Sequence, residues 1–271
     1  MKRLLTAAVG APLGLWALFA LPSPVFFWVV AALFCLAAWE YTRILAHWAP
    51  TAPRWVVIVL IPLVALALAP GQRLSGRLEA LPWVAFVLSV GAGVLVLVVR
   101  TAVKESAPAM GGLAFGALYM GLPIAALSEL QNRSPWLLFL LLAIVWLGDS
   151  AAFYFGTRFG RHQLAPVVSP NKSWEGAIAA VVVSGVVAVA WSAWRDARID
   201  VFLLLLALLT SVAAQLGDLV ESSLKRGAGI KDSGNLLPGH GGFLDRLDAL
   251  AFAAPVWWFA LELGARLPSR P

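Results

Sequence analysis

The stretch VFLLLLALLTSVAAQLGDLVE, residues 201–221, decides the fold class of this chain. No charged residue occurs before Asp218 in this stretch, and most of its side chains are aliphatic. A helix of about 20 mostly apolar residues crosses the ~30 Å hydrocarbon core of a bilayer. The stretch therefore predicts a membrane-spanning helix that carries a carboxylate near its end.

The composition of the whole chain agrees with a lipid environment. Of its 271 residues, 61% are hydrophobic and 13% are charged, and the mean hydropathy is +0.85. Soluble domains are about 25% charged, so these values exclude a water-soluble globular protein. The only cysteine is Cys35, which excludes an intrachain disulfide and a metal cluster built from cysteines.

Eight further apolar runs resemble residues 201–221 in character. The nine expected helices lie at residues 4–21, 25–46, 55–69, 78–99, 109–127, 135–157, 174–194, 201–221 and 249–266. The turn residues 21–24 separate the first two runs, and the alternative is that these two form one interrupted element. Lys2 and Arg3 also resemble the start of a cleavable signal, but no small-x-small cleavage site follows before the second run. We expect an all-α integral membrane protein with about nine transmembrane helices.

The sequence predicts one continuous membrane domain, because it contains no internal repeat or long linker. We expect N-terminal transmembrane helices in residues 1–130 and a catalytic region, with a polar cavity that faces the cytoplasm, in residues 131–271. Thirteen of the 20 Lys and Arg residues then lie on the amino-terminal side and seven on the other. The positive-inside rule therefore predicts a cytoplasmic amino terminus. The basic residues behind the net charge of +6 lie in short loops between apolar runs. This distribution is more typical of a membrane protein with phosphate ligands than of a protein that binds nucleic acid.

Two carboxylates interrupt apolar runs in the carboxy-terminal half of the chain. These are Asp149 and Asp218. A charge near the centre of a bilayer costs about 2.5–3.5 kcal/mol, so such residues usually face a polar cavity or a cation. The alternative is that each residue only ends a helix at the membrane interface.

The end of the run at residues 201–221 combines a carboxylate with a hydroxyl and an ammonium group. Asp218, Ser222 and Lys225 are spaced i, i+4 and i+7, so they share one face of a helix that could bind a metal and a phosphate together. The alternative role of Lys225 and Arg226 is to neutralise the negative carboxyl end of the helix.

A glycine-rich loop precedes the last apolar run. Three glycines and a proline stand within residues 238–242, where the backbone can approach a ligand closely. Asp245 and Asp248 follow on one helical face, and carboxylate oxygens are the ligands that Mg²⁺ prefers. The alternative is that both acids complement the helix dipole. His240 is either a base or ligand, or a residue that supports the loop and orients the substrate.

Residues 169–176, Ser-Pro-Asn-Lys-Ser-Trp-Glu-Gly, include residues that are typical of a helix start and one lysine that this role does not explain. Ser173 suits an N-cap and Glu175 a first turn. Lys172 remains as a candidate for binding phosphate. The chain contains neither GxxxxGK[ST] nor HExxH, which excludes a P-loop and a zincin.

The segments 222–226, 231–234 and 237–248 together closely resemble the signature of the phosphatidate cytidylyltransferases, also called CDP-diacylglycerol synthases. Residues 169–176 resemble the other recurrent cytoplasmic motif of that family. The resemblance covers residues 145–250, whereas the first 130 residues match only as hydrophobic spans.

The resemblance implies transfer of CMP from CTP to phosphatidic acid, which gives CDP-diacylglycerol and pyrophosphate. It implies a Mg²⁺-dependent homodimer, with room for a second cation beside Mg²⁺, surrounded by lipid in a bacterial-type inner membrane. The implied metal ligands are Asp218, Asp245 and Asp248, with Asp149 as a further candidate. The residues expected to act in catalysis are Asp218, Ser222, Lys225, Arg226, Asp245 and Asp248. The residues expected to bind substrate are Lys172, Ser173, Lys231, His240, Gly241, Gly242 and Arg246.

Two other functions stay open on the sequence. A CTP-dependent kinase of lipid alcohols would release CDP in place of pyrophosphate. An ion-coupled transporter would use Asp149 and Asp218 as ion sites in broken helices, although the polar residues gather on one side of the expected membrane.

Overall fold

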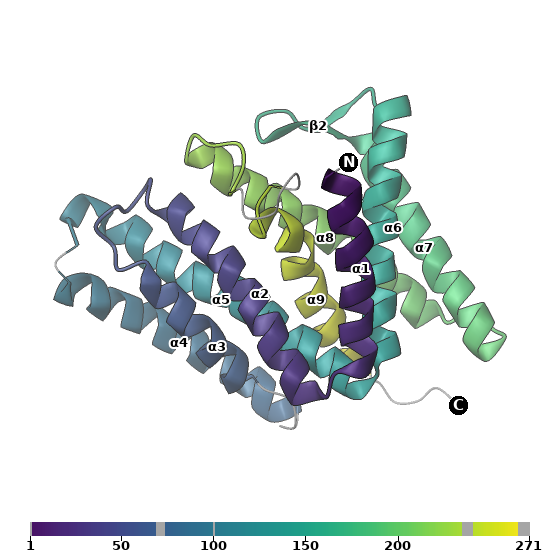
Figure 1. Ribbon diagram of the computed structural model, residues 1–271, viewed down its shortest axis with the longest axis horizontal. Coiled ribbons are helices and arrows are strands. Elements are labelled where there is room, and N and C mark those ends of the chain that lie inside the picture. Colours follow the sequence, from purple (N-terminus) through teal and green to yellow (C-terminus); the bar gives the residue numbers. More distant parts are fainter. Residues whose placement is uncertain (1, 69–73, 100, 235–240, 265–271) are drawn as a thin grey trace. The chain divides into compact units, whose positions relative to one another are not determined.

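Nine α-helices make up most of the described part of the chain in its computed structural model (Figure 1). The structure describes residues 2–68, 74–99, 101–234 and 241–264. The helices are α1 Lys2–Ala20, α2 Ser23–Leu45, α3 Trp55–Ala67, α4 Leu74–Val98, α5 Ser106–Arg133, α6 Pro135–Phe159, α7 Trp174–Asp196, α8 Val201–Gly227 and α9 Leu244–Gly264. A short 3-10 helix, Val103–Glu105, precedes α5, and two strands, β1 Gln163–Ala165 and β2 Ser169–Ser173, lie between α6 and α7.

Each expected apolar run coincides with one of these helices. The largest differences in the bounds are at α5, which continues to Arg133, at α8, which continues to Gly227, and at α9, which begins at Leu244 and so includes Asp245 in its first turn. The reason is that polar residues at the membrane interface extend a helix beyond the apolar run that predicts it. The expected ends at residues 69 and 266 lie outside the described residues.

The chain is a helical integral membrane protein. Among the described residues, six helical segments are long and apolar enough to cross a bilayer: Ser23–Leu45, Val103–Arg133, Pro135–Phe159, Trp174–Asp196, Val201–Gly227 and Leu244–Gly264. Large apolar side chains such as Leu97, Trp83 and Trp194 are 77%, 70% and 72% exposed, as lipid-facing side chains are. The expected number of nine spans stays a prediction, because Trp55–Ala67 and Trp83–Val98 are shorter apolar segments.

The strands β1 and β2 are a departure from the all-α expectation. They pair antiparallel, with Gln163 opposite Ser173 and Ala165 opposite Ser169. Glu175 stabilises the entry to this hairpin, because its Oε2 accepts hydrogen bonds from the backbone N–H groups of Arg161 and His162 at 3.1 and 3.3 Å. Strands of three and five residues are too short to show a periodic pattern in the sequence.

The chain forms two compact units that are discontinuous in sequence. One comprises Met1–Asn132 with Leu224–Leu247, and the other comprises Arg133–Ser223 with Asp248–Pro271. Helices α8 and α9 therefore each run through both units. The expected division into residues 1–130 and 131–271 stays a prediction.

In the first unit, α5 packs closely against α2 and α3 through glycines. A Cβ atom added to Gly116 would lie 2.4 Å from the Tyr41 ring. The Tyr41 hydroxyl donates a hydrogen bond of 2.8 Å to the carbonyl of Gly112. Small residues allow such close helix packing in membranes, where the hydrophobic effect does not drive helices together. At one end of this unit, Thr51 donates to the Glu105 carboxylate through its backbone N–H at 3.0 Å and its hydroxyl at 2.7 Å.

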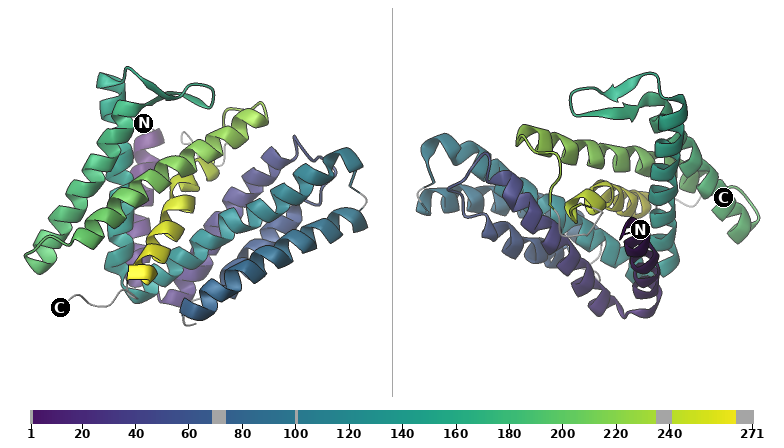
Figure 2. Two further views of the ribbon diagram at one scale, coloured as in Figure 1. Left: turned by 180° about the vertical axis from the view of Figure 1, so that it is seen from behind. Right: turned by 45° about the horizontal axis from the view of Figure 1, so that its top comes forward.

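In the second unit, α6 and α7 pack antiparallel along most of their length, and the hairpin projects beyond one end of the pair (Figure 2). A cluster of aromatic rings lies at the opposite end of these helices. Its ring centroids are 6.1 Å apart for Trp136 and Trp191 and 5.4 Å apart for Trp191 and Trp194. Tryptophans are enriched where helices leave the bilayer, so this end is suited to a membrane interface.

Candidate active site

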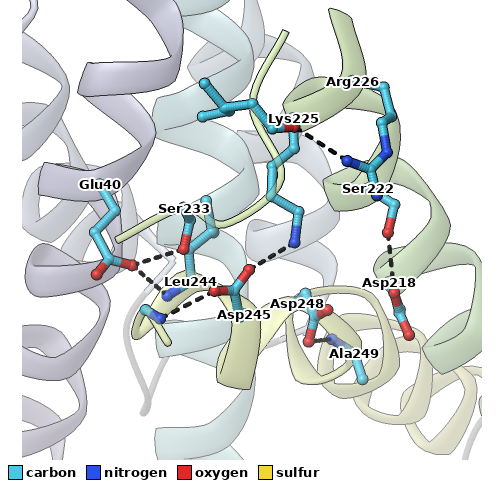
Figure 3. Close-up of polar contacts among 12 residues, drawn as sticks. Glu40, Asp218, Ser222, Lys225, Arg226, Ser233, Leu244, Asp245, Asp248 and Ala249 are labelled. Carbon is cyan, nitrogen blue, oxygen red and sulfur yellow. Dashed lines mark hydrogen bonds and ion pairs between the residues drawn. The ribbon is translucent and has the colours of Figure 1, made fainter. Parts of the chain in front are cut away.

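In the first unit, an ion pair joins the last turn of α8 to the first turn of α9 (Figure 3). The Lys225 Nζ lies 2.6 Å from Asp245 Oδ1, and the two side chains are 12% and 16% exposed. The other carboxylate oxygen, Oδ2, accepts a hydrogen bond of 2.9 Å from the backbone N–H of Gly242. Gly241 has a φ of 77°, a left-handed conformation that favours glycine and turns the chain into α9. Asp245 is therefore held through both of its oxygens.

In the second unit, an ion pair joins the hairpin to α8. Lys172, on β2, places its Nζ 2.6 Å from Asp218 Oδ2, and these side chains are 26% and 40% exposed. The Ser222 hydroxyl donates to Asp218 Oδ1 at 3.3 Å, which confirms that Asp218 and Ser222 share a helical face (Figure 3). The Lys172–Asp218 pair thus joins a cation of the hairpin to a carboxylate of α8.

Helices α8 and α9 are in backbone contact beside two of the candidate carboxylates in the second unit. A Cβ atom added to Gly217 would lie 2.4 Å from the carbonyl oxygen of Asp248. The Asp248 side chain is 9% exposed, and its Oδ1 accepts a hydrogen bond of 2.8 Å from the N–H of Ala249. Glycine at position 217 allows this approach because any side chain there would separate the helices that carry Asp218 and Asp248.

Asp149 also belongs to this neighbourhood of the second unit. It is exposed on α6 and is close enough to Asp218 and Lys172 for their charges to interact. This neighbourhood of the second unit therefore brings together Asp149 of α6, Lys172 of β2 and Asp218 of α8.

The other expected site residues differ in what the structure says of them. Ser173 is the N-cap of α7, because its hydroxyl accepts a hydrogen bond of 3.2 Å from Gly176 N–H. Arg226 is exposed and donates to the carbonyl of Ile230 at 3.3 Å. Lys231 and Arg246 are exposed. His240 lies outside the described residues.

The donor set is chemically suited to a hard cation, although no ready-made cluster is present in the described ranges. Within residues 2–68, 74–99, 101–234 and 241–264, no three His, Cys, Asp or Glu side chains converge as metal ligands. Asp218 and Asp245 instead face ammonium groups at 2.6 Å. Each of these carboxylates is suited to a divalent ion in place of its lysine, because the same oxygens attract either cation.

Residues 1–263 of the chain match the sequence model of the cytidylyltransferase family. The chain belongs to this family. The phosphatidate cytidylyltransferase of Bacillus subtilis (strain 168) is 39% identical over 158 residues, which are 57% of this chain and 59% of that protein. The phosphatidate cytidylyltransferase of Staphylococcus haemolyticus (strain JCSC1435) is 46% identical over 128 residues, which are 46% of this chain and 49% of that protein. The same enzyme of Staphylococcus aureus (strain COL) is 47% identical over 129 residues, 46% of this chain and 50% of that protein.

The chain thus spans about half the length of these members of the cytidylyltransferase family. The apolar helices and the bacterial origin of the relatives support a protein of the bacterial plasma membrane.

One residue of this family member that sequence reasoning missed is Glu40 of α2. Its carboxylate is fully buried and accepts hydrogen bonds from Ser233 and Leu244, on either side of the glycine-rich loop. A signal was present, because Glu40 is the only acidic residue in the apolar run at 25–46. The argument applied to Asp149 and Asp218 applies equally to it.

Proposed function

We propose that this chain transfers CMP from CTP to phosphatidic acid and releases pyrophosphate, as a phosphatidate cytidylyltransferase. The observation that carries the proposal is the pairing of a lysine from each of the two signature regions with a carboxylate, Lys172 with Asp218 and Lys225 with Asp245. A reaction between two polyanions needs cationic side chains that bind the phosphates. It also needs carboxylates that hold a metal ion. The apolar helices suit a substrate whose acyl chains stay in the bilayer. The names of the bacterial relatives support the same reaction.

The reaction needs neutralisation of charge more than it needs a base. A phosphate oxygen of phosphatidic acid attacks the α-phosphorus of CTP, and the bond between the α-phosphorus and its bridging oxygen to the β-phosphate breaks. A phosphate monoester is largely dianionic at neutral pH because its second pKa is about 6. The attacking oxygen therefore carries its electron pair already, and no side chain has to remove a proton.

The basic residues would hold the phosphate oxygens of both substrates. Lys172 and Lys225 would exchange a carboxylate partner for a phosphate, while the exposed Arg226 and Arg246 and the exposed Lys231 would attract the anionic headgroup. Ser222 would orient Asp218 through its hydrogen bond. Gly242, and Gly241 in its left-handed conformation, would let the backbone approach the nucleotide.

Asp218, Asp245 and Asp248 would hold Mg²⁺, with Asp149 as a further ligand and with room for a second cation beside Mg²⁺. When bound, Mg²⁺ would withdraw charge from the phosphates of CTP and stabilise the departing pyrophosphate. Hydrogen bonds from Ser222 and Gly242 to these carboxylates would set the orientation of their oxygens.

The proposed arrangement in the membrane follows from the distribution of basic residues. Nine spans, a cytoplasmic amino terminus and a polar cavity open to the cytoplasm would expose the hairpin and the α8–α9 connection to cytoplasmic CTP. A homodimer is proposed from the family resemblance alone.

The test is product analysis with purified protein in detergent, α-³²P-labelled CTP and phosphatidic acid. We expect labelled CDP-diacylglycerol and an equal amount of unlabelled pyrophosphate, because the labelled α-phosphorus stays with the CMP group. Labelled CDP with a phosphorylated lipid alcohol would support a kinase in its place. Failure to consume CTP with any lipid in the presence of Mg²⁺ or Mn²⁺ would contradict the proposal.

A further inference from the structure

Glu40 is a buried carboxylate that does not belong to either signature motif. It lies on α2 and has an exposed fraction of 0%. Its Oε2 accepts hydrogen bonds from the Ser233 hydroxyl at 3.0 Å and from the Leu244 backbone N–H at 2.9 Å (Figure 3). Burying a carboxylate is costly, so a structure keeps one where its hydrogen bonds are needed.

The donors to Glu40 come from both ends of the α8–α9 connection. Ser233 precedes the glycine-rich loop, and Leu244 is the first residue of α9. The backbone N–H groups of the first turn of a helix have no partner within the helix and carry partial positive charge. Glu40 satisfies one of them and is stabilised by the same dipole.

The backbone of the connection closes around the Glu40 carboxylate through two glycines. A Cβ atom at Gly234 would lie 2.3 Å from Oε1, and one at Gly242 would lie 2.2 Å from Oε2. Any larger residue at either position would collide with Glu40. A side chain at either position would therefore force the Glu40 carboxylate to shift away from its hydrogen-bond donors.

The same connection orients Asp245. Gly242, which packs against Glu40, donates its N–H to Asp245 Oδ2, and Leu244, which donates to Glu40, adjoins Asp245 in the chain. Lys225 completes the arrangement by pairing with Asp245 Oδ1. A displacement of the Glu40 carboxylate would move the turn that sets the direction of the Asp245 carboxylate. All of these contacts lie within the first unit.

We propose that Glu40 is a positioning residue, which anchors the α8–α9 connection to α2 and thereby fixes the Asp245 carboxylate for cation binding. The proposal rests on the proposed function for its catalytic consequence. The anchoring itself does not depend on which reaction the protein catalyses.

The first experiment measures anchoring without activity. Ser233 is 4% exposed, so in a Cys35→Ala background a Ser233→Cys variant should react slowly with a maleimide in detergent. Adding Glu40→Ala should increase the labelling rate by at least about tenfold, since the hydrogen bond from the Leu244 backbone N–H to a charged group is lost. An unchanged labelling rate would overturn the anchoring.

The second experiment measures the catalytic consequence with a matched control. Glu40→Gln preserves shape and removes charge, and it should lower kcat by about tenfold and raise the Mg²⁺ concentration needed for half-maximal rate. Glu105→Gln makes the same change at a buried carboxylate, 7% exposed, that also accepts two hydrogen bonds, and it should leave both values unchanged. Equal effects of the two substitutions, or none from Glu40→Gln, would overturn the positioning role.

A third comparison covers the case in which Glu40→Ala does not fold. Gly234→Ala should lower kcat because the new methyl group collides with Glu40. The double variant Gly234→Ala/Glu40→Gln keeps the collision, so it should be no more active than Gly234→Ala alone. A Gly234→Ala variant with wild-type kcat and Mg²⁺ dependence would contradict the close contact. If the wild-type protein forms no CDP-diacylglycerol while Ser233→Cys is still protected by Glu40, the proposed function fails and the anchoring stands.

Discussion

The two lysine–aspartate pairs have the same chemistry and the same separation, yet their surroundings differ. Both place Nζ 2.6 Å from a carboxylate oxygen. The side chains of Lys225 and Asp245 are 12% and 16% exposed, whereas those of Lys172 and Asp218 are 26% and 40% exposed. The pair in the first unit is thus mostly shielded from solvent, and the pair in the second unit is open to it.

The hydrogen bond to the second oxygen of each carboxylate is also different in the two pairs, and it is shorter in the shielded pair. Asp245 Oδ2 accepts from a backbone N–H at 2.9 Å, and Asp218 Oδ1 accepts from the Ser222 hydroxyl at 3.3 Å. A backbone donor is fixed by the fold, while a hydroxyl rotates. The difference indicates that the Lys225–Asp245 pair is the more firmly held of the two, and that Lys172 and Asp218 can exchange partners at lower cost.

The largest expected effect concerns the side of the membrane on which the two pairs lie. In a Cys35→Ala background, Val167→Cys in the hairpin and Asp232→Cys after Lys225 should be labelled by an impermeant maleimide only after cells are opened, because we expect both loops to be cytoplasmic. Arg198→Cys, in the exposed connection between α7 and α8, should be labelled in intact cells. Labelling of position 167 or 232 from outside would break the expected topology.

The next effect is on the rate. Asp218→Asn, Asp245→Asn and Asp248→Asn should each lower kcat by about 10²-fold or more while the protein still inserts. Each removes a proposed ligand of the metal ion that neutralises charge in the transition state. Asp196→Asn, at an exposed position at the end of α7, is the matched control and should retain wild-type kcat. Wild-type turnover by any of the three variants in saturating Mg²⁺ would remove that residue from the site.

A smaller effect separates the two lysines. Lys225→Ala should lower the free energy of unfolding by about 1–3 kcal/mol, because it takes a charged partner from a shielded carboxylate. Lys172→Ala should lower it by at most about 1 kcal/mol, because exposed ion pairs contribute little. Both should raise the KM for CTP or phosphatidic acid and lower kcat.

Thermal unfolding in detergent and steady-state kinetics check these values. If Lys225→Ala lowers only thermal stability and leaves both KM values and kcat unchanged, its role is to neutralise the helix dipole.

The helices could be predicted from the sequence because a bilayer sets the length of an apolar run. The run at 174–194 corresponds to α7 at Trp174–Asp196, and the N-cap at Ser173 was expected and is confirmed. The hairpin could not be predicted, since its strands are too short for periodicity and are stabilised by Glu175 of the next helix. The length of the apolar runs does not fix the number of membrane spans, because α3 has only 13 residues.

The candidate site was predictable in its residues but not in its pairings. Asp218 and Lys225 lie on one helix, α8, as expected, but the sequence did not predict the pairing of Lys225 with Asp245 across the connection. Glu40 is 193 positions from Ser233, so no local pattern relates them. Contacts between distant segments depend on helix packing, which hydrophobic periodicity does not specify.

The most direct test of the central claim is Mn²⁺ binding measured by electron paramagnetic resonance on the purified protein, without turnover. That claim is our proposal that the lysine-paired carboxylates Asp218 and Asp245, and Asp248, bind a metal ion. We predict that wild-type protein binds Mn²⁺ and that each Asp→Asn substitution weakens binding by at least about tenfold, whereas Asp196→Asn does not. Undiminished Mn²⁺ binding by all three variants would contradict the account.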